Sequence, residues 1–279
     1  IYGAFLENPA LQVIGSGIFH SGVFITSGNA TSALALYTSA TNTTGPNIVI
    51  GATGVADGST NRSNIAIGFG ALGNLENARS NNLAVGTNAM GDATAGQANV
   101  ALGHQAGQNI RPGGNTGGNT FVGANAGQGD GNVNNNTQDC TFVGNQAGIN
   151  VLQGRDHVAI GKEAMRQHQE ALESGNVVVG ADALRNATAG EHNTIIGHQA
   201  GENITSTGGN NTILGALPAA AQFDNTIAIG AGTTQKVLIS GDNFTLTSDD
   251  GDDATFVTSS LTADRTYTLP NQAGTIALT

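Results

Sequence analysis

Carboxylates are the side chains of this sequence that could carry out hydrolysis. Enzymes that cleave polysaccharides use two carboxyl groups a few ångströms apart, one as a general acid and the other as a base or nucleophile. Residues 47–150 hold few acids, and none recurs at an equivalent place in successive segments: Asp57, Glu76, Asp92, Asp130 and Asp139. We therefore predict no catalytic residue and no enzymatic activity, with a surface-polysaccharide depolymerase as the less favoured alternative.

Histidines and a run of aspartates are the candidates for metal binding. His104 and His198 occupy the same motif, GHQAG. On a threefold axis one such histidine per chain could form a metal or anion ring, but an imidazole that makes a hydrogen bond or faces solvent is the preferred interpretation. The segment SDDGDD at 248–253 offers oxygen ligands for Ca²⁺ yet lacks the EF-hand spacing and its closing glutamate, so we favour an acidic hairpin. We assign no metal and no cofactor.

The composition excludes several classes of partner. A formal net charge of -11 repels a nucleic-acid backbone and an anionic membrane surface, and no apolar run is long enough to span a bilayer. The 10% of charged residues is far below the usual quarter, and there are 42 glycines. There is no Trp, and no Tyr between Tyr37 and Tyr267, so this region has no obvious ring on which a sugar could stack.

A short sequence motif recurs along most of the chain, as in NIAIGFGAL at 64–72 and NLAVGTNAM at 82–90. Aligning on the glycine that closes each apolar run gives eleven repeats, spaced by 15 to 21 residues: Gly51, Gly68, Gly86, Gly103, Gly123, Gly144, Gly161, Gly180, Gly197, Gly215 and Gly230. This period is too short for two helices per unit and lacks the leucine-rich pattern. We predict an all-β chain whose coils stack as a parallel β-solenoid, or β-roll, of about eleven short coils.

Each short strand should alternate its faces, so the residues one and three before the glycine share a side. Pairs such as Ile65 and Ile67 are aliphatic, and we assign them to the core. The residue between them should then point outward, yet it is apolar in every repeat: Val49, Ala66, Ala84, Ala101, Phe121, Phe142, Ala159, Val178, Ile195, Ile213 and Ala228. A strand that is apolar on both faces is covered on both, so a second layer or another copy of the chain must cover the outer one.

The size of this middle residue varies inversely with that of the residue four places after the glycine. The large Phe121 is paired with Gly127, and the small Ala84 is paired with Met90. Only Ala101, which is paired with Gly107, departs from the rule. The exchange predicts that the two side chains fill one space of fixed volume. We place that space at a seam between symmetry-related chains. The predicted seam residues are Ala66, Leu72, Met90, Phe121, Phe142, Met165, Leu184, Ile195 and Ile213.

An asparagine heads most repeats: Asn47, Asn64, Asn82, Asn99, Asn119, Asn176, Asn193 and Asn211. These amides could stack from coil to coil, giving and accepting hydrogen bonds, or they could simply tolerate the turn before the strand. The single cysteine, Cys140, is expected to be a small buried hydrophobe.

Two repeats carry insertions, NIRPGGNTGG at 109–118 and QGDGNVNNNTQD at 128–139. Polar loops that protrude from a rigid scaffold are common places for recognition, although tolerated insertions without a role explain them equally well. The candidate receptor-binding residues are Asn109, Arg111, Asn115, Asp130, Asn132, Asn134, Asn135 and Asp139.

The tandem motif N-x-x-[IVL]-G-x-x-A, from residue 47 to about 232, resembles the head repeats of YadA-like trimeric autotransporter adhesins and of related bacteriophage tail fibre proteins. LTADRTYTLPNQAGTIALT, at 261–279, is similar to a segment common in phage tail fibres. The resemblance implies a left-handed β-roll in a homotrimeric fibre on an extracellular virion tail. The implied role is a structural and adhesive one in host-cell attachment, with a bacterial trimeric adhesin head on the cell surface as the alternative.

These expectations divide the chain into three parts. Residues 1–45 form an N-terminal cap or adaptor, 46–232 the β-roll, and 233–279 a β-strand and hairpin segment of the fibre. The implied partners are two further copies of the chain, a host cell-surface receptor that is a glycan or a protein, and other virion tail proteins. No nucleic-acid binding and no membrane insertion are expected.

Overall fold

The computed structural model divides the chain into two compact units, Ile1–Thr234 and Gln235–Thr279. The residues that it describes are 25–26, 33–35, 47–51, 63–73, 80–92, 96–110, 117–131, 136–151, 153–167, 173–187, 190–202, 209–216, 227–229, 243–247 and 253–257. The predicted cap at 1–45, apart from two short strands, and most of the predicted segment 233–279 lie outside the described residues.

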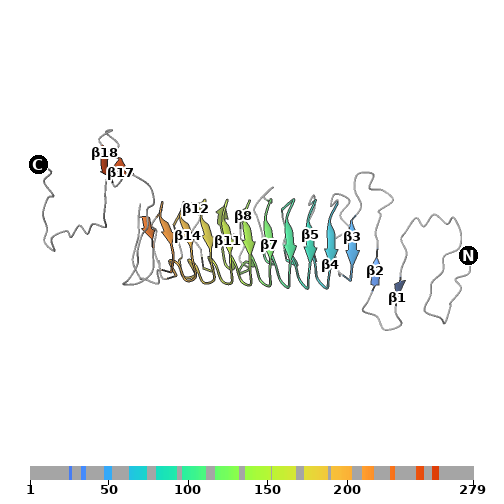
Figure 1. Cartoon of the computed structure of the whole chain (residues 1–279). Coiled ribbons are helices and arrows are strands. Elements are labelled where there is room, and N and C mark those ends of the chain that lie inside the picture. The colour runs from blue at the N-terminus through green and yellow to red at the C-terminus, as the bar shows by residue number, and fades with distance from the viewer. Residues whose placement is uncertain are drawn as a thin grey trace, which may run out of the picture. The chain divides into compact units, whose positions relative to one another are not determined.

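The first unit is built on one long sheet whose strands stack side by side (Figure 1). Its order is β1(Ile25–Thr26), β2(Ala33–Ala35), β3(Ile48–Ile50), β4(Ile65–Ile67), β5(Leu83–Val85), β6(Val100–Leu102), β7(Thr120–Val122), β9(Thr141–Val143), β11(Val158–Ile160), β13(Val177–Val179), β14(Thr194–Ile196), β15(Thr212–Leu214) and β16(Ile227–Ile229). From β3 onward each strand pairs in parallel with the next, in equivalent register, whereas β1 and β2 pair antiparallel. The repeat thus forms a parallel β-solenoid, of which the described residues make about seven turns.

Each coil turns sharply after its three-residue strand. In the coil of β5, Gly86 directly follows the strand, Asn88 and Met90 adopt the left-handed conformation with φ of 54° and 49°, and Ala89 lies between them. The same alternation recurs in the coils of β11 and β13. These bends direct the alanine and the residue after it back toward the middle residue of the strand, and all three are buried.

The interior of the solenoid therefore lies on the opposite face of the strand from the one the sequence analysis assigned. The middle residue is buried, while its two neighbours are half-buried or exposed, as in Ile65, Ala66 and Ile67. The predicted seam is wrong for the same reason. All nine of its residues lie inside a single chain, with exposed fractions of 0–2%: Ala66, Leu72, Met90, Phe121, Phe142, Met165, Leu184, Ile195 and Ile213.

The shared space is confirmed, although it lies inside the coil. A Cβ added to Gly127 would lie less than 3.0 Å from the ring of Phe121, closer than real Cβ atoms come. The exception to the rule also has an explanation, because a Cβ at Gly107 would meet Phe121 of the following coil at 2.8 Å and Met90 of the preceding coil at 3.2 Å. The large side chains of the two neighbouring coils thus fill the space beside Ala101.

Of the two interpretations of the repeated asparagines, the structure shows the stacked ladder. Asn99 donates from its backbone N–H and its side-chain amide to Oδ1 of Asn82, at 3.1 and 3.0 Å, and its own Oδ1 accepts the same pair of bonds from Asn119. Asn193 and Asn211 repeat the arrangement farther along the chain. Because these amides are buried, the bonds that link one coil to the next form away from water.

Two smaller sheets accompany the solenoid sheet. A parallel sheet of β8(Asn136–Gln138), β10(Gln153–Arg155) and β12(Glu173–Ser174) precedes β9, β11 and β13, so these three coils carry a second strand before the bend. In the second unit, β17(Asn243–Thr247) and β18(Asp253–Val257) pair antiparallel on either side of residues 248–252. This pairing agrees with the predicted acidic hairpin.

Candidate interaction surface

The outward side of the solenoid sheet is apolar along its length. The residue directly before each closing glycine points away from the interior and is aliphatic in every strand of this sheet from β3 to β16: Ile50, Ile67, Val85, Leu102, Val122, Val143, Ile160, Val179, Ile196, Leu214 and Ile229. Ile160, Ile196 and Ile229 are 40%, 42% and 51% exposed. We call this column, together with the first residue of each strand from β3 to β16, the outer face.

The outer face also contains no charged side chain, and its apolar area is large for the surface of a single chain. Its first-residue column contains isoleucine, leucine, valine and threonine alone, so neither column contains a charged side chain. Strands spaced by about 4.8 Å make the face roughly 50 Å long, and three-residue strands make it about 10 Å wide. A contiguous apolar strip of on the order of 500 Å² is at the upper end of what monomeric proteins expose.

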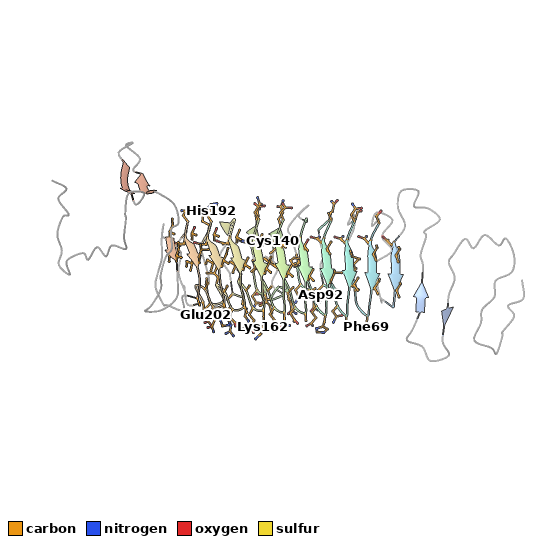
Figure 2. All side chains as sticks on the ribbon, viewed as in Figure 1. Phe69, Asp92, Cys140, Lys162, His192 and Glu202 are labelled. Carbon is orange, nitrogen blue, oxygen red and sulfur yellow. The ribbon has the colours of Figure 1, made fainter. Side chains whose placement is uncertain are left out.

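The edge of the solenoid that follows the strands carries Asp92, Lys162 and Glu202, together with the exposed ring of Phe69 (Figure 2). Glu163 forms ion pairs with two cations. Its Oε2 lies 2.8 Å from Nε of Arg185, and its Oε1 lies 3.3 Å from Nζ of Lys162. Burial opposes the ionised form of Glu163, but the hydrogen bond from Lys162 and the charges of Arg185 and Arg166 outweigh it and lower the pKa of this carboxyl below 4.5. A carboxylate held ionised by cations is a poor general acid.

Nearer the middle of the chain, hydrogen bonds between polar side chains link the coils along this edge. Gln108 donates to Asp92 at 2.9 Å, Gln128 donates to Gln108 at 3.2 Å, and Asn125 donates to Gln105 at 3.1 Å. Hydrogen bonds at this edge therefore support the stacking of the coils, and five of the six exposed large hydrophobic residues in the described part of the chain lie on the outer face.

Three of the predicted receptor-binding residues belong to described parts of the chain. Asn109 is half-buried and donates to the carbonyl of Gly129 at 3.3 Å, whereas Asp130 and Asp139 are exposed. The other five lie outside the described residues: Arg111, Asn115, Asn132, Asn134 and Asn135. Binding by the two loops stays a prediction.

The ladder contains two groups of chemical interest that the sequence analysis did not connect. Cys140 and His157 replace asparagine in successive coils and are buried. Burial raises the pKa of the Cys140 thiol to about 12, and its Sγ lies 3.6 Å from the carbonyl of Gly154. His157 accepts at Nδ1 from the backbone N–H of Asn176 at 3.2 Å. A protonated, buried thiol is unreactive, so Cys140 is structural, as expected. The interruption of the asparagine pattern was the signal that could have placed both residues.

The remaining candidates for metal binding are dispersed. His104 and His198 are exposed on separate coils, and Asp253 begins β18 while Asp249, Asp250 and Asp252 lie outside the described residues. Within the described ranges, no three His, Cys, Asp or Glu residues gather closely enough to hold a metal ion.

Comparison with protein-family models, with curated proteins and with solved structures finds no match to this chain. Among the described residues, no helix has the length and apolar character needed to cross a membrane. The class of protein is defined by the fold and the outer face: it is an all-β parallel solenoid with an apolar sheet face.

Proposed function

We propose that this chain is a structural and adhesive segment of a trimeric bacteriophage tail fibre, which holds a host-recognition surface on a rigid rod of about eleven coils per chain. The observation that carries the proposal is the outer face, an uncharged apolar strip that runs along the solenoid sheet from β3 to β16. Burying such a strip between chains is favourable because it removes apolar surface from water.

A further copy of the same chain is the partner that fits this face. The side chains of the face recur with the strand spacing of about 4.8 Å, and a partner must share that spacing to pack against it over roughly 50 Å. Two such faces together would bury on the order of 1,000 Å², which is about the minimum expected of a specific interface. The absence of charge on the face lets copies approach there despite the net charge of -11 on each chain.

Three chains, a left-handed coil, a place on the virion and attachment to a host cell come from the resemblance of the repeat and of residues 261–279 to phage tail fibres and YadA-like adhesins. A bacterial trimeric autotransporter adhesin would use the same assembly and is the alternative. In either case the partner is a surface receptor, and the inserted loops are the candidate binding elements.

The assembly is tested by placing a charge on the outer face. Val122 lies half-buried in the middle of the face on β7, so Val122→Asp should leave the fold of each chain intact. In the assembly it would bury unpaired carboxylates, which costs about 2–5 kcal/mol per interface. We expect sedimentation equilibrium at micromolar concentration to show a trimer for the parent chain and mostly monomer for the variant.

The matched control is Ala98→Asp, which adds the same charge at an exposed position just before the ladder residue Asn99. It should remain trimeric. A folded parent monomer at micromolar concentration, or a Val122→Asp variant that assembles as well as the Ala98→Asp control, would contradict assembly through the outer face.

The adhesive role is tested by shortening the two inserted loops, 109–118 and 128–139, to the length of a regular coil. If recognition lies there, the shortened chain should assemble normally but bind at least tenfold less to bacteria that the intact fibre attaches to, because several weak contacts would be lost together. Binding is measured by flow cytometry with the fluorescently labelled protein. Unchanged binding by a normally assembled variant would place recognition outside these loops.

A further inference from the structure

The first residues of the outer-face strands follow a pattern that the proposed fibre does not by itself explain. Threonine heads four strands: Thr120 in β7, Thr141 in β9, Thr194 in β14 and Thr212 in β15. These are the strands of the series from β3 to β16 whose buried middle residue is phenylalanine or isoleucine. In the other strands of that series the middle residue is alanine or valine, and the first residue is isoleucine, leucine or valine.

The threonines are arranged as two adjacent pairs. Thr120 is the register partner of Thr141, and Thr194 is the register partner of Thr212. Two strands that begin with valine, β11 and β13, separate the pairs. Within each pair the two hydroxyl-bearing side chains therefore lie on neighbouring strands of the same face.

Apart from these pairs, the outer face is nearly the same at every strand. A partner copy displaced by one strand, about 4.8 Å along the solenoid, would still meet an aliphatic column. Strands with a uniform face specify their register weakly and are prone to slip. A long solenoid that assembles through such a face needs some feature that distinguishes one displacement from another.

Threonine supplies such a feature. When copies are related by an axis parallel to the solenoid, strands with the same number lie at the same height, so the threonines of the copies lie at matching levels and their hydroxyls can hydrogen-bond to each other. A displacement by one strand sets threonine against an aliphatic residue at four of the ten strands that still overlap. Each mismatch buries a hydroxyl without a partner, which is unfavourable.

We propose that the two threonine pairs fix the axial register in which copies of this chain assemble, as a buried polar residue fixes register in a coiled coil. The inference rests on the proposed assembly through the outer face and adds the residues that align it. The aliphatic columns supply most of the stabilisation, and Thr120, Thr141, Thr194 and Thr212 select one displacement among several of similar energy.

The register is measured with cysteines on separate chains. Val85 and Leu102 are outer-face residues on adjacent strands. Val85→Cys chains and Leu102→Cys chains are mixed, refolded together and oxidised, and disulfides between chains are identified by mass spectrometry. Aligned copies form only Val85→Cys to Val85→Cys and Leu102→Cys to Leu102→Cys bonds. A mixed bond requires a displacement of one strand. Cys140 is buried inside the chain and does not compete.

The test compares three backgrounds. The parent sequence should give same-position disulfides. Replacing all four threonines by valine should raise the fraction of mixed disulfides at least tenfold while the variant still assembles. Replacing the four by serine, which keeps the hydroxyls, should leave the parent pattern unchanged.

Same-position disulfides alone in the valine variant would overturn the proposed role of the threonines while leaving the assembly intact. Mixed disulfides at similar levels in the parent and both variants would also overturn it. A parent chain that sediments as a folded monomer and forms no disulfides between chains would instead overturn the assembly itself, and this inference with it.

Discussion

Replacing Gly123 by alanine is expected to lower the free energy of unfolding by more than about 4 kcal/mol or to prevent folding. Gly123 directly follows β7 and has a φ of 130°, which residues with a side chain rarely adopt. A Cβ built there would lie less than 3.0 Å from the backbone carbonyl of Gly144 in the next coil. Because that carbonyl belongs to a coil that is itself stacked on another, the clash can be relieved only by moving backbone. Urea unfolding followed by circular dichroism measures the loss.

Gly51 provides the matched control for this prediction. It directly follows β3 and has a φ of 63°, and a Cβ built there has no atom within 4 Å. Gly51→Ala should therefore cost only about 1–2 kcal/mol, the penalty for an alanine in the left-handed conformation. Equal losses at Gly51 and Gly123 would show that the close approach of the next coil is not the reason for glycine at the end of the strand.

The second large effect concerns the space that the strand shares with the turn. Phe121 is fully buried, with its ring centroid 5.7 Å from that of Phe142. Phe121→Ala should cost about 3–5 kcal/mol per chain because it leaves a cavity. Adding Gly127→Leu should recover part of that loss, since Leu72 and Leu184 occupy the equivalent place with φ of 52° and 47° in coils whose strand residue is small.

A double-mutant cycle isolates the shared space from the separate effects of the two changes. Gly127→Leu alone should destabilise the chain, because a Cβ at Gly127 would lie less than 3.0 Å from the Phe121 ring. In the background of Phe121→Ala the same change should stabilise it, so the sign of the effect reverses. Urea unfolding of all four chains measures the coupling. A double mutant no more stable than Phe121→Ala would contradict a shared space.

Features that repeat in every coil could be predicted from the sequence. The closing glycines defined the repeat, and parallel stacking was predicted because the period is too short for two helices per unit and lacks the leucine-rich pattern. The volume exchange between Phe121 and Gly127 was predicted as well, and the asparagine ladder was one of two interpretations left open, because each is a comparison between equivalent positions. Such comparisons can be made without knowing which face of each strand lies inside the solenoid.

The second sheet was not predicted. NTQ at β8, QGR at β10 and ES at β12 carry no apolar alternation that would mark a strand. These segments are strands because the neighbouring coils hold them at the strand spacing, where their backbone groups can pair. Stacking, a long-range property, overrides local preference there.

Which face of the strand lies inside was decided by the tertiary structure alone. The sequence determined that residues such as Ile65 and Ile67 share one side and Ala66 the other, because strand side chains alternate. The sequence did not determine which of these two sides faces the interior, since both sides are apolar. The left-handed bends that bring Ala71 and Leu72 back against Ala66 close a narrow interior with room for only one side chain per strand. That geometry buries the middle residue and leaves its two larger neighbours on the outer face.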